Sequence, residues 1–333
     1  MAGPHIRRIQ RYLLGLEGSR INVAKLPELR ARVEAQQQAG RDFTQQEYLS
    51  IVREICADTP PDFALTFGAS RHLAEMGIVG HAILSCGTLR RGLAIWMNFA
   101  DLTGEPFRGR SSVATGRWTL EFQLTAVLPP ATGRFCSEEF AASFVRFAHE
   151  TTGYDCADAI VEFHHTPHPG LDYARYLPGR ISFGAARNRL ILPEAVLDRP
   201  ILSRDDELCG LLVEQALARR PGQEHDGRTA RQLRQLFIMS PGTTPPLTEA
   251  ADALGLSTRT LNRRLKAEGT SYTRILAAFR NDYAKALARE GTLGTKQIAH
   301  AVGFRSHQSL RRAFTQWNGH PLGGWRGTVP DED

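Results

Sequence analysis

TKQIAHAVGFRSHQSLRRAFTQW, residues Thr295–Trp317, decides the fold of the last third of this 333-residue chain. Its first part spaces apolar residues as one face of a short helix does, at Ile298, Ala299 and Val302. Gly303 is expected to end that helix, because glycine adopts the left-handed conformation that a tight turn requires. Ser306 then caps a second helix. This order predicts a helix-turn-helix unit.

The second helix of this unit is expected to have two different faces. Leu310 and Phe314 are spaced to point into the core. The opposite face carries charged or hydrogen-bonding side chains, namely His307, Gln308, Arg311 and Arg312.

The same pattern occurs a second time in Leu247–Lys266, LTEAADALGLSTRTLNRRLK. Here Gly255 ends the first helix, Ser257 caps the second, and Leu261 and Leu265 face inward. The outer face carries polar and basic side chains: Thr258, Arg259, Asn262, Arg263 and Lys266. The two turn glycines lie 48 residues apart. A tandem pair is far more specific than one unit, because short helix pairs are common.

Tyr272–Arg289 lies between the two units and carries apolar residues along one side. It predicts a connecting helix about 27 Å long. Such a helix would set the two outer faces about one turn of DNA apart, near 34 Å. One chain is therefore expected to read two successive segments of the major groove.

The residue types on the outer faces suit DNA. Arginine forms bidentate bonds with guanine or neutralises phosphate, and Asn262 and Gln308 suit adenine edges. The alternative is an ordinary solvated helix surface, but the shared face in both repeats favours DNA. The charge distribution also favours DNA binding, because residues 228–326 contain sixteen Lys and Arg but only five Asp and Glu. That segment has a net charge of +11, which leaves −5 for the rest of a chain whose total is +6.

The remainder predicts an α+β N-terminal domain, residues 1–205, ahead of an all-α C-terminal domain. Helical spacing dominates its beginning, and strand-like alternation follows in 117–127. Residues 206–227 are expected to be a linker, because 218–226 (ARRPGQEHD) are polar with Pro and Gly. The DNA-binding domain is then 228–327, with its two units at about 247–268 and 295–317 joined by the long helix, and 328–333 form a tail.

Several classes of protein are disfavoured. The five cysteines are scattered and never spaced C-x-x-C, so we expect no zinc site and mostly buried thiols, with a redox-sensing cysteine as the minor alternative. No apolar run is long enough to span a membrane and no signal peptide pattern occurs, so we expect a cytoplasmic protein. No nucleophile elbow or phosphate-binding glycine loop is present, so we expect no catalytic residues and no cofactor.

The cluster HHTPHP contains His164, His165 and His168. No further ligand pattern accompanies these histidines, so a structural role is favoured over a metal site.

An effector pocket can be lined by aromatic residues, and Trp96, Trp118 and Phe122 are candidates. Arg117 is a candidate to hold a carboxylate, as are Arg90 and Arg91. The plainer interpretation is that the aromatic residues are core and the arginines are surface.

The C-terminal motifs closely resemble those of the AraC/XylS family of bacterial transcription regulators. The match comprises Ile298-Ala299, Val302-Gly303-Phe304, Ser309-Leu310, Ala313-Phe314 and Trp325-Arg326, with Arg280, Ala284 and Leu287 in the linking helix. Pro321 stands one place earlier than the proline of the family pattern. The resemblance covers residues 228–327.

Residues 10–205 resemble the effector domain of the ornithine-regulator branch of that family, called arabinose-binding-like. The similar segments include Phe67-Gly68, Cys86-Gly87-Thr88-Leu89, Val161-Glu162-Phe163 and Leu197-Asp198-Arg199-Pro200. The resemblance implies a domain that senses a small molecule and pairs subunits as a homodimer. It also implies binding to double-stranded promoter DNA and activation through RNA polymerase.

A different class remains as the alternative: a DNA-targeted enzyme, such as an alkyl-transfer fusion. That chemistry needs a reactive cysteine in a defined motif, and none of the five cysteines lies in one.

Overall fold

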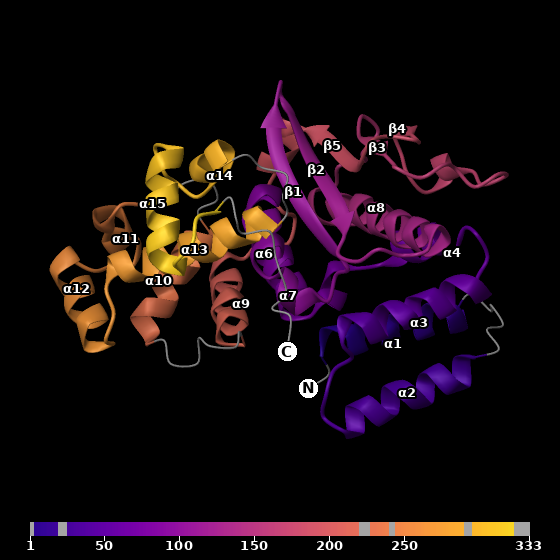
Figure 1. Ribbon diagram of the computed structural model, residues 1–333, viewed down its shortest axis with the longest axis horizontal. Coiled ribbons are helices and arrows are strands. Elements are labelled where there is room, and N and C mark those ends of the chain that lie inside the picture. Colours follow the sequence, from indigo (N-terminus) through magenta and orange to yellow (C-terminus); the bar gives the residue numbers. More distant parts are fainter. Residues whose placement is uncertain (1–2, 19–24, 220–226, 240–243, 290–294, 323–333) are drawn as a thin grey trace. The chain divides into compact units, whose positions relative to one another are not determined.

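The computed structural model describes residues 3–18, 25–219, 227–239, 244–289 and 295–322, which form two compact units (Figure 1). Unit 1 is Met1–Gly92 with Phe99–Cys209, and unit 2 is Leu93–Asn98 with Gly210–Asp333.

Unit 1 combines helices with one mixed sheet. Its longer helices are α1 (Pro4–Gly18), α2 (Leu26–Gln38), α3 (Gln45–Asp58), α4 (Phe63–Ser70), α5 (Ile78–Ser85) and α8 (Pro130–Thr152). Short helices are η1 (Leu73–Met76), α7 (Ala100–Thr103), η2 (Tyr173–Arg175) and η3 (Glu194–Asp198). The strands are β1 (Phe107–Ala114), β2 (Arg117–Leu124), β3 (Ile160–Glu162), β4 (Arg180–Ser182) and β5 (Asn188–Pro193). Helices α6 (Leu89–Asn98) and α9 (Asp206–Ala218) each have residues in both units.

The sheet has the order β1-β2-β5-β3-β4, and every pairing is antiparallel except that of β3 with β4. Alternate residues of β2 are buried, as its sequence predicts for a half-covered strand. Helix α8 packs on this face, where Trp118 stacks on Phe144 at 5.7 Å and Phe122 lies 4.7 Å from Phe140 between ring centroids. The expected α+β domain is confirmed. Strand β1 was not foreseen, because all but one of its residues are at least partly exposed and leave no alternating pattern.

A buried network of charges joins α1 to α8. The guanidinium of Arg8 donates to both oxygens of Glu139, at 3.0 and 3.1 Å, and to the Tyr48 hydroxyl at 2.7 Å. Arg71 donates to the same Glu139 carboxylate at 3.0 Å, and Glu105 pairs with Arg8. Arg8, Arg71 and Glu139 are each at most 5% exposed. Two arginines and two glutamates therefore neutralise one another inside the unit, which is the condition for burying them.

Glu139→Gln tests this network. We expect it to lower the free energy of unfolding by about 3–5 kcal/mol, because it removes the carboxylate that both buried arginines, Arg8 and Arg71, contact at 3.0 Å. Urea unfolding of the full chain measures the loss. Glu28→Gln, on the exposed side of α2, is the control and should change stability by less than about 0.5 kcal/mol. Equal stability of the two variants would contradict the role of the network.

Unit 2 is helical from α10 onward in the described residues. Its helices are α10 (Arg228–Met239), α11 (Leu247–Ala253), α12 (Thr258–Ala267), α13 (Tyr272–Arg289), α14 (Thr295–Ala301) and α15 (His307–Asn318). One apolar core joins α10, α11 and α12, and a second joins α14 and α15. Helix α13 contributes Ile275 to the first core, and Ala284 and Ala288 to the second. The two helix-turn-helix units and the long helix between them are confirmed.

The segment expected to be a linker, residues 206–227, is helical in its first half. Helix α9 covers Asp206–Ala218 and buries Cys209, Val213, Ala216 and Leu217. The polar stretch ARRPGQEHD begins at Ala218, the last residue of this helix, and its residues 220–226 lie outside the described part of the chain. The domain boundaries themselves stay predictions.

Candidate DNA-binding surface and effector site

The corners of the two helix-turn-helix units have the same backbone geometry. Gly255 and Gly303 both have positive φ, 65° and 80°. The residue after each glycine donates its N–H to a carbonyl five positions back, Leu256 to Ala251 at 2.9 Å and Phe304 to Ala299 at 2.8 Å. A side chain other than hydrogen is strained at such a φ. Glycine therefore sets the angle at which each second helix leaves its corner.

The second helices α12 and α15 also begin in the same way. The Ser257 hydroxyl accepts from Thr260 N, and the Ser306 hydroxyl accepts from Ser309 N, both at 3.2 Å. Each cap satisfies one of the backbone donors that a helix start leaves unpaired.

The faces of α12 and α15 divide as the sequence predicts. Leu261, Leu265, Leu310 and Phe314 are each 0% exposed. Of the expected DNA-contacting residues, Thr258 is half-buried and all the others are exposed. The exposed residues are Arg259, Asn262, Arg263 and Lys266 on α12, and His307, Gln308, Arg311 and Arg312 on α15. Each set lies on one side of its own helix, so each helix presents a polar, mostly basic surface.

Two supports of these helices were not foreseen from the sequence. The first is Glu268, just after α12, whose carboxylate accepts from Thr229 N and Ala230 N at 2.9 Å each. Partial burial opposes ionisation, but these hydrogen bonds hold the pKa of Glu268 below its ordinary value. The carboxylate thereby caps the start of α10 and ties it to the end of α12.

The second support is Arg280, in the middle of α13. Its Nη2 donates to Gly303 O at 3.1 Å and to Thr244 Oγ1 at 2.9 Å, and its guanidinium lies 4.9 Å from the centroid of the Phe304 ring. Gly303 and Phe304 form the corner of the second helix-turn-helix motif, whereas Thr244 lies just before the first helix-turn-helix motif. One side chain of the connecting helix therefore links the corner of the second motif to the segment that leads into the first.

Arg280→Met is expected to lower the free energy of unfolding by about 2 kcal/mol, because it removes two hydrogen bonds and a cation–π contact while keeping the apolar stem. Thermal or urea unfolding followed by circular dichroism measures the change. Arg274→Met, at an exposed position of the same helix, is the matched control. If both variants lose the same stability, Arg280 does not fasten the corner.

The expected effector residues are only partly brought together. Trp118 and Phe122 lie on β2 and are buried under α8, at 4% and 1% exposure. Arg117, also on β2, donates to Asp158 O at 3.0 Å. Trp96 lies in α6 within unit 2. Arg90 and Arg91 pair with Asp198 and Asp206, respectively.

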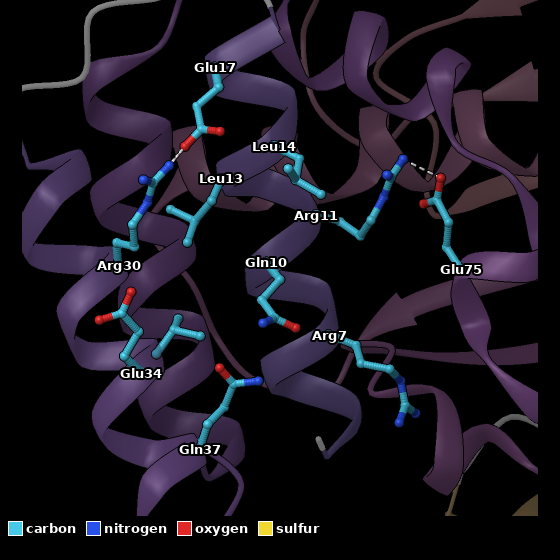
Figure 2. A pocket seen from close by; sticks show the side chains of 11 residues that line it. Arg7, Gln10, Arg11, Leu13, Leu14, Glu17, Arg30, Glu34, Gln37 and Glu75 are labelled. Atoms are coloured by element: carbon cyan, nitrogen blue, oxygen red, sulfur yellow. Dashed lines mark hydrogen bonds and ion pairs between the residues drawn. The ribbon is translucent and has the colours of Figure 1, made fainter. Parts of the chain in front are cut away.

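A hollow of about 470 Å³ lies elsewhere in unit 1, between α1 and α2 and beside η1 (Figure 2). Its apolar lining is Leu13, Leu14 and Val33, and its polar lining is Arg7, Gln10, Arg11, Glu17, Arg30, Glu34, Gln37 and Glu75. Figure 2 shows the pairs Arg11–Glu75 and Arg30–Glu17 at its rim. The volume is in the range of small-molecule sites, and both signs of charge line it. The sequence could not reveal it, because α1 and α2 each carry ordinary surface charges.

One histidine of the cluster HHTPHP, His165, lies beside a buried carboxyl group. His165 Nδ1 donates to Thr166 O at 2.9 Å, which leaves Nε2 facing Glu138 Oε1 at 3.8 Å. The Tyr173 hydroxyl donates to Glu138 at 2.6 Å, and Glu138 is 0% exposed. Burial raises the pKa of Glu138 to about 7, and burial also lowers the pKa of His165. The described residues contain no cluster of three or more potential metal ligands.

Glu138→Gln is expected to remove a pH dependence. The folded state favours the protonated carboxyl group, so its contribution to the free energy of unfolding is full below pH 4.5 and is lost as the pH rises through about 7. The loss is about 3 kcal/mol for a shift of this size. Glutamine keeps the neutral hydrogen-bonding shape at every pH.

Urea unfolding at pH 5 and pH 8 checks this. Relative to wild type, the free energy of unfolding of the variant should be higher at pH 8 than at pH 5, because only the wild-type protein loses stability when Glu138 ionises. The same difference at both pH values would mean that Glu138 does not titrate as described.

No helix in the described part of the chain combines the length and apolar character needed to cross a bilayer. Two family models match the chain. The arabinose-binding domain of AraC transcription regulators matches residues 26–201, and a helix-turn-helix domain matches residues 250–328.

Relatives along most of the chain are transcription regulators. The chain is 27% identical to the ornithine utilization regulator of Pseudomonas aeruginosa, over 84% of this chain and 81% of that protein. It is also 27% identical to an uncharacterised HTH-type transcriptional regulator of Mycobacterium tuberculosis, over 81% of this chain and 80% of that one. The crystal structure of the transcriptional regulator CdpR from Pseudomonas aeruginosa has the same fold, with a TM-score of 0.52 at 21% identity, covering 96% of this chain and 98% of that one.

Proposed function

The chain belongs to the family of AraC transcription regulators with an arabinose-binding N-terminal domain, and we propose that its two helix-turn-helix units read two successive segments of one promoter. The protein is a transcription regulator with an effector-binding domain and a DNA-binding domain. The observation that carries the proposal is the repeated corner. Two helices with the same entry geometry, each with two fully buried apolar residues on its inner side, present the same kind of polar surface.

We assign different roles to the residue types on these surfaces. Arg259, Arg263, Arg311 and Arg312 contact guanine edges or phosphates, because their guanidinium groups are exposed and can bind bidentately. Asn262 and Gln308 contact adenine edges, and Thr258, Lys266 and His307 contact the backbone or base edges.

The effector domain offers two alternative sites. The first is the set foreseen from the sequence, Trp96, Arg117, Trp118 and Phe122, and the second is the hollow between α1 and α2. We favour the hollow, because it is open to solvent and charged, whereas Trp118 and Phe122 are enclosed core residues. Its mixed charges suit a molecule with both an amino and a carboxylate group. One relative is named an ornithine utilization regulator, so ornithine is a suitable first probe.

A thermal-shift series with ornithine and other amino acids tests the effector site. Glu34→Lys should abolish the shift if the hollow binds the effector, and Arg117→Ala should abolish it if β2 does. A shift that survives both substitutions would contradict both sites.

The remaining functional assignments rest on family membership. We propose that the protein works in the cytoplasm, activates transcription through RNA polymerase, and pairs as a homodimer through unit 1. We also propose that it has no enzymatic activity. The alkyl-transfer alternative requires an accessible nucleophilic cysteine, and four of the five thiols are buried, with Cys56 half-buried.

Arg263→Ala and Arg312→Ala are expected to weaken specific DNA binding by about 1–3 kcal/mol each where the arginine reads a base. The loss should be smaller on unrelated DNA. If the arginine contacts phosphate instead, binding should fall uniformly and the salt dependence should become shallower.

Arg53→Ala is the control, since it removes one exposed positive charge from α3 of unit 1. Gel-shift titrations at several salt concentrations, on sites found by selection from genomic fragments, measure all three variants. Unchanged affinity of both recognition-helix variants would refute the assigned surface.

A further inference from the structure

Two cysteines that are far apart in sequence meet inside unit 1. The Cys86 and Cys209 side chains are hydrogen-bonded to each other, and both are 0% exposed. Cys86 ends α5, and Cys209 lies in the first turn of α9. Cys156, by contrast, has its side-chain contacts with backbone carbonyls, at Val145 and Tyr154.

Backbone hydrogen bonds join the segment around Cys86 to the segment that precedes Cys209. Ile201 N donates to Gly87 O at 3.3 Å and Leu89 N donates to Arg199 O at 3.3 Å, which pairs the two segments. Asp205 N donates to Ser85 O at 2.8 Å, directly beside both cysteines.

Side chains fasten the same two segments. Ser203 Oγ donates to Leu84 O at 2.7 Å, and Arg91 pairs with Asp206 at 3.3 Å. Arg90 donates to both oxygens of Asp198 at 2.8 Å each. Contact between the thiols is therefore imposed by the fold on either side of them, rather than by a chance rotamer.

The two thiols are not equivalent. Cys86 Sγ can donate to Ile83 O or Thr88 O, at 3.1 and 3.3 Å, as well as to Cys209. The hydrogen bond from Cys86 lowers the pKa of Cys209, whereas that same bond and burial raise the pKa of Cys86. Cys209 is thus the more readily ionised sulfur, with Cys86 beside it as the protonated partner. This is the arrangement of an attacking and a resolving thiol.

We propose that Cys86 and Cys209 form a redox-active dithiol that hydrogen peroxide converts into an intramolecular disulfide. The Cys209 thiolate attacks one peroxide oxygen, which gives a sulfenic acid and releases hydroxide, and the hydroxide takes up the proton that the Cys209 thiol lost and becomes water. The Cys86 sulfur then attacks the sulfenic sulfur, the S–S bond forms, and a second water leaves. Overall, two thiols and one peroxide give one disulfide and two water molecules. A thiol reductant reverses the reaction.

Burial determines which oxidants the pair accepts. Both sulfurs lie beneath the surface, so a peroxide, which is little larger than water, reaches them during brief openings of the segment. A bulky disulfide such as oxidised glutathione is excluded. The bond would join the end of α5 to the start of α9 and close a long loop of the chain, which stabilises the folded state.

The test treats the reduced full chain with hydrogen peroxide and digests it under non-reducing conditions. Mass spectrometry should detect a peptide that links Cys86 to Cys209. Thiol titration in denaturant should show a loss of two of the five thiols, restored by dithiothreitol. The oxidised protein should melt several degrees higher than the reduced one.

Variants locate the reaction. Cys86→Ser and Cys209→Ser should each abolish the linked peptide and the rise in melting temperature, whereas Cys156→Ser should retain both. The wild-type mass spectrum needs no variant, so it decides the matter even if a serine variant fails to fold.

Three results would overturn the proposal. One is peroxide treatment that leaves both thiols reduced, and another is a disulfide that involves other cysteines in place of this pair. The third is a glutathione adduct on Cys86 or Cys209 that forms as fast as the peroxide product, because burial would then not govern access.

Discussion

The left-handed backbone at Gly255 and Gly303 is the constraint on which the DNA-binding surface depends. Each glycine ends one helix and allows a serine two or three residues later to cap the next helix. Because the corner fixes where α12 and α15 begin, it also fixes which of their residues face the core and which face outward. The proposed DNA contacts of the exposed arginines depend on Leu261 and Phe314, which lie on the opposite sides of the two helices and are buried in the cores.

The two corners differ in how they are supported. The second is held by Arg280, which contacts Gly303 O and the Phe304 ring, whereas a side chain at Gly255 would meet open space. The first helix-turn-helix motif instead packs against α10, and Glu268 caps the start of α10. The repeated motif thus stands in two different settings. Because their supports differ, we expect the two helix-turn-helix motifs to differ in their tolerance of substitution.

Unit 1 keeps several ionisable groups where water cannot reach them. Arg8 and Arg71 neutralise Glu139, whereas the neighbouring residue on α8, Glu138, accepts a hydrogen bond from the Tyr173 hydroxyl and has His165 Nε2 at 3.8 Å. Two adjacent carboxyl groups therefore have different surroundings: Glu139 lies between two guanidinium groups, whereas burial raises the pKa of Glu138 and favours its protonated form. The cysteine pair adds a third buried group whose chemistry depends on its neighbour.

The sequence by itself determined the local features: the helix-turn-helix repeat, its caps and its turns, the long helix α13, and the alternation that makes β2 a strand. These signals are short-range, because a glycine, a serine cap and an apolar period act within one or two turns. The nine exposed or half-exposed candidate residues on α12 and α15 followed from the same periodicity. Tertiary structure alone decided what distant segments do together: Arg280 on the corner of the second unit, Glu268 on α10, the hollow between α1 and α2, and Cys86 beside Cys209. The residue types alone do not predict such pairings, because the pairings arise from the packing of segments that are far apart in the chain.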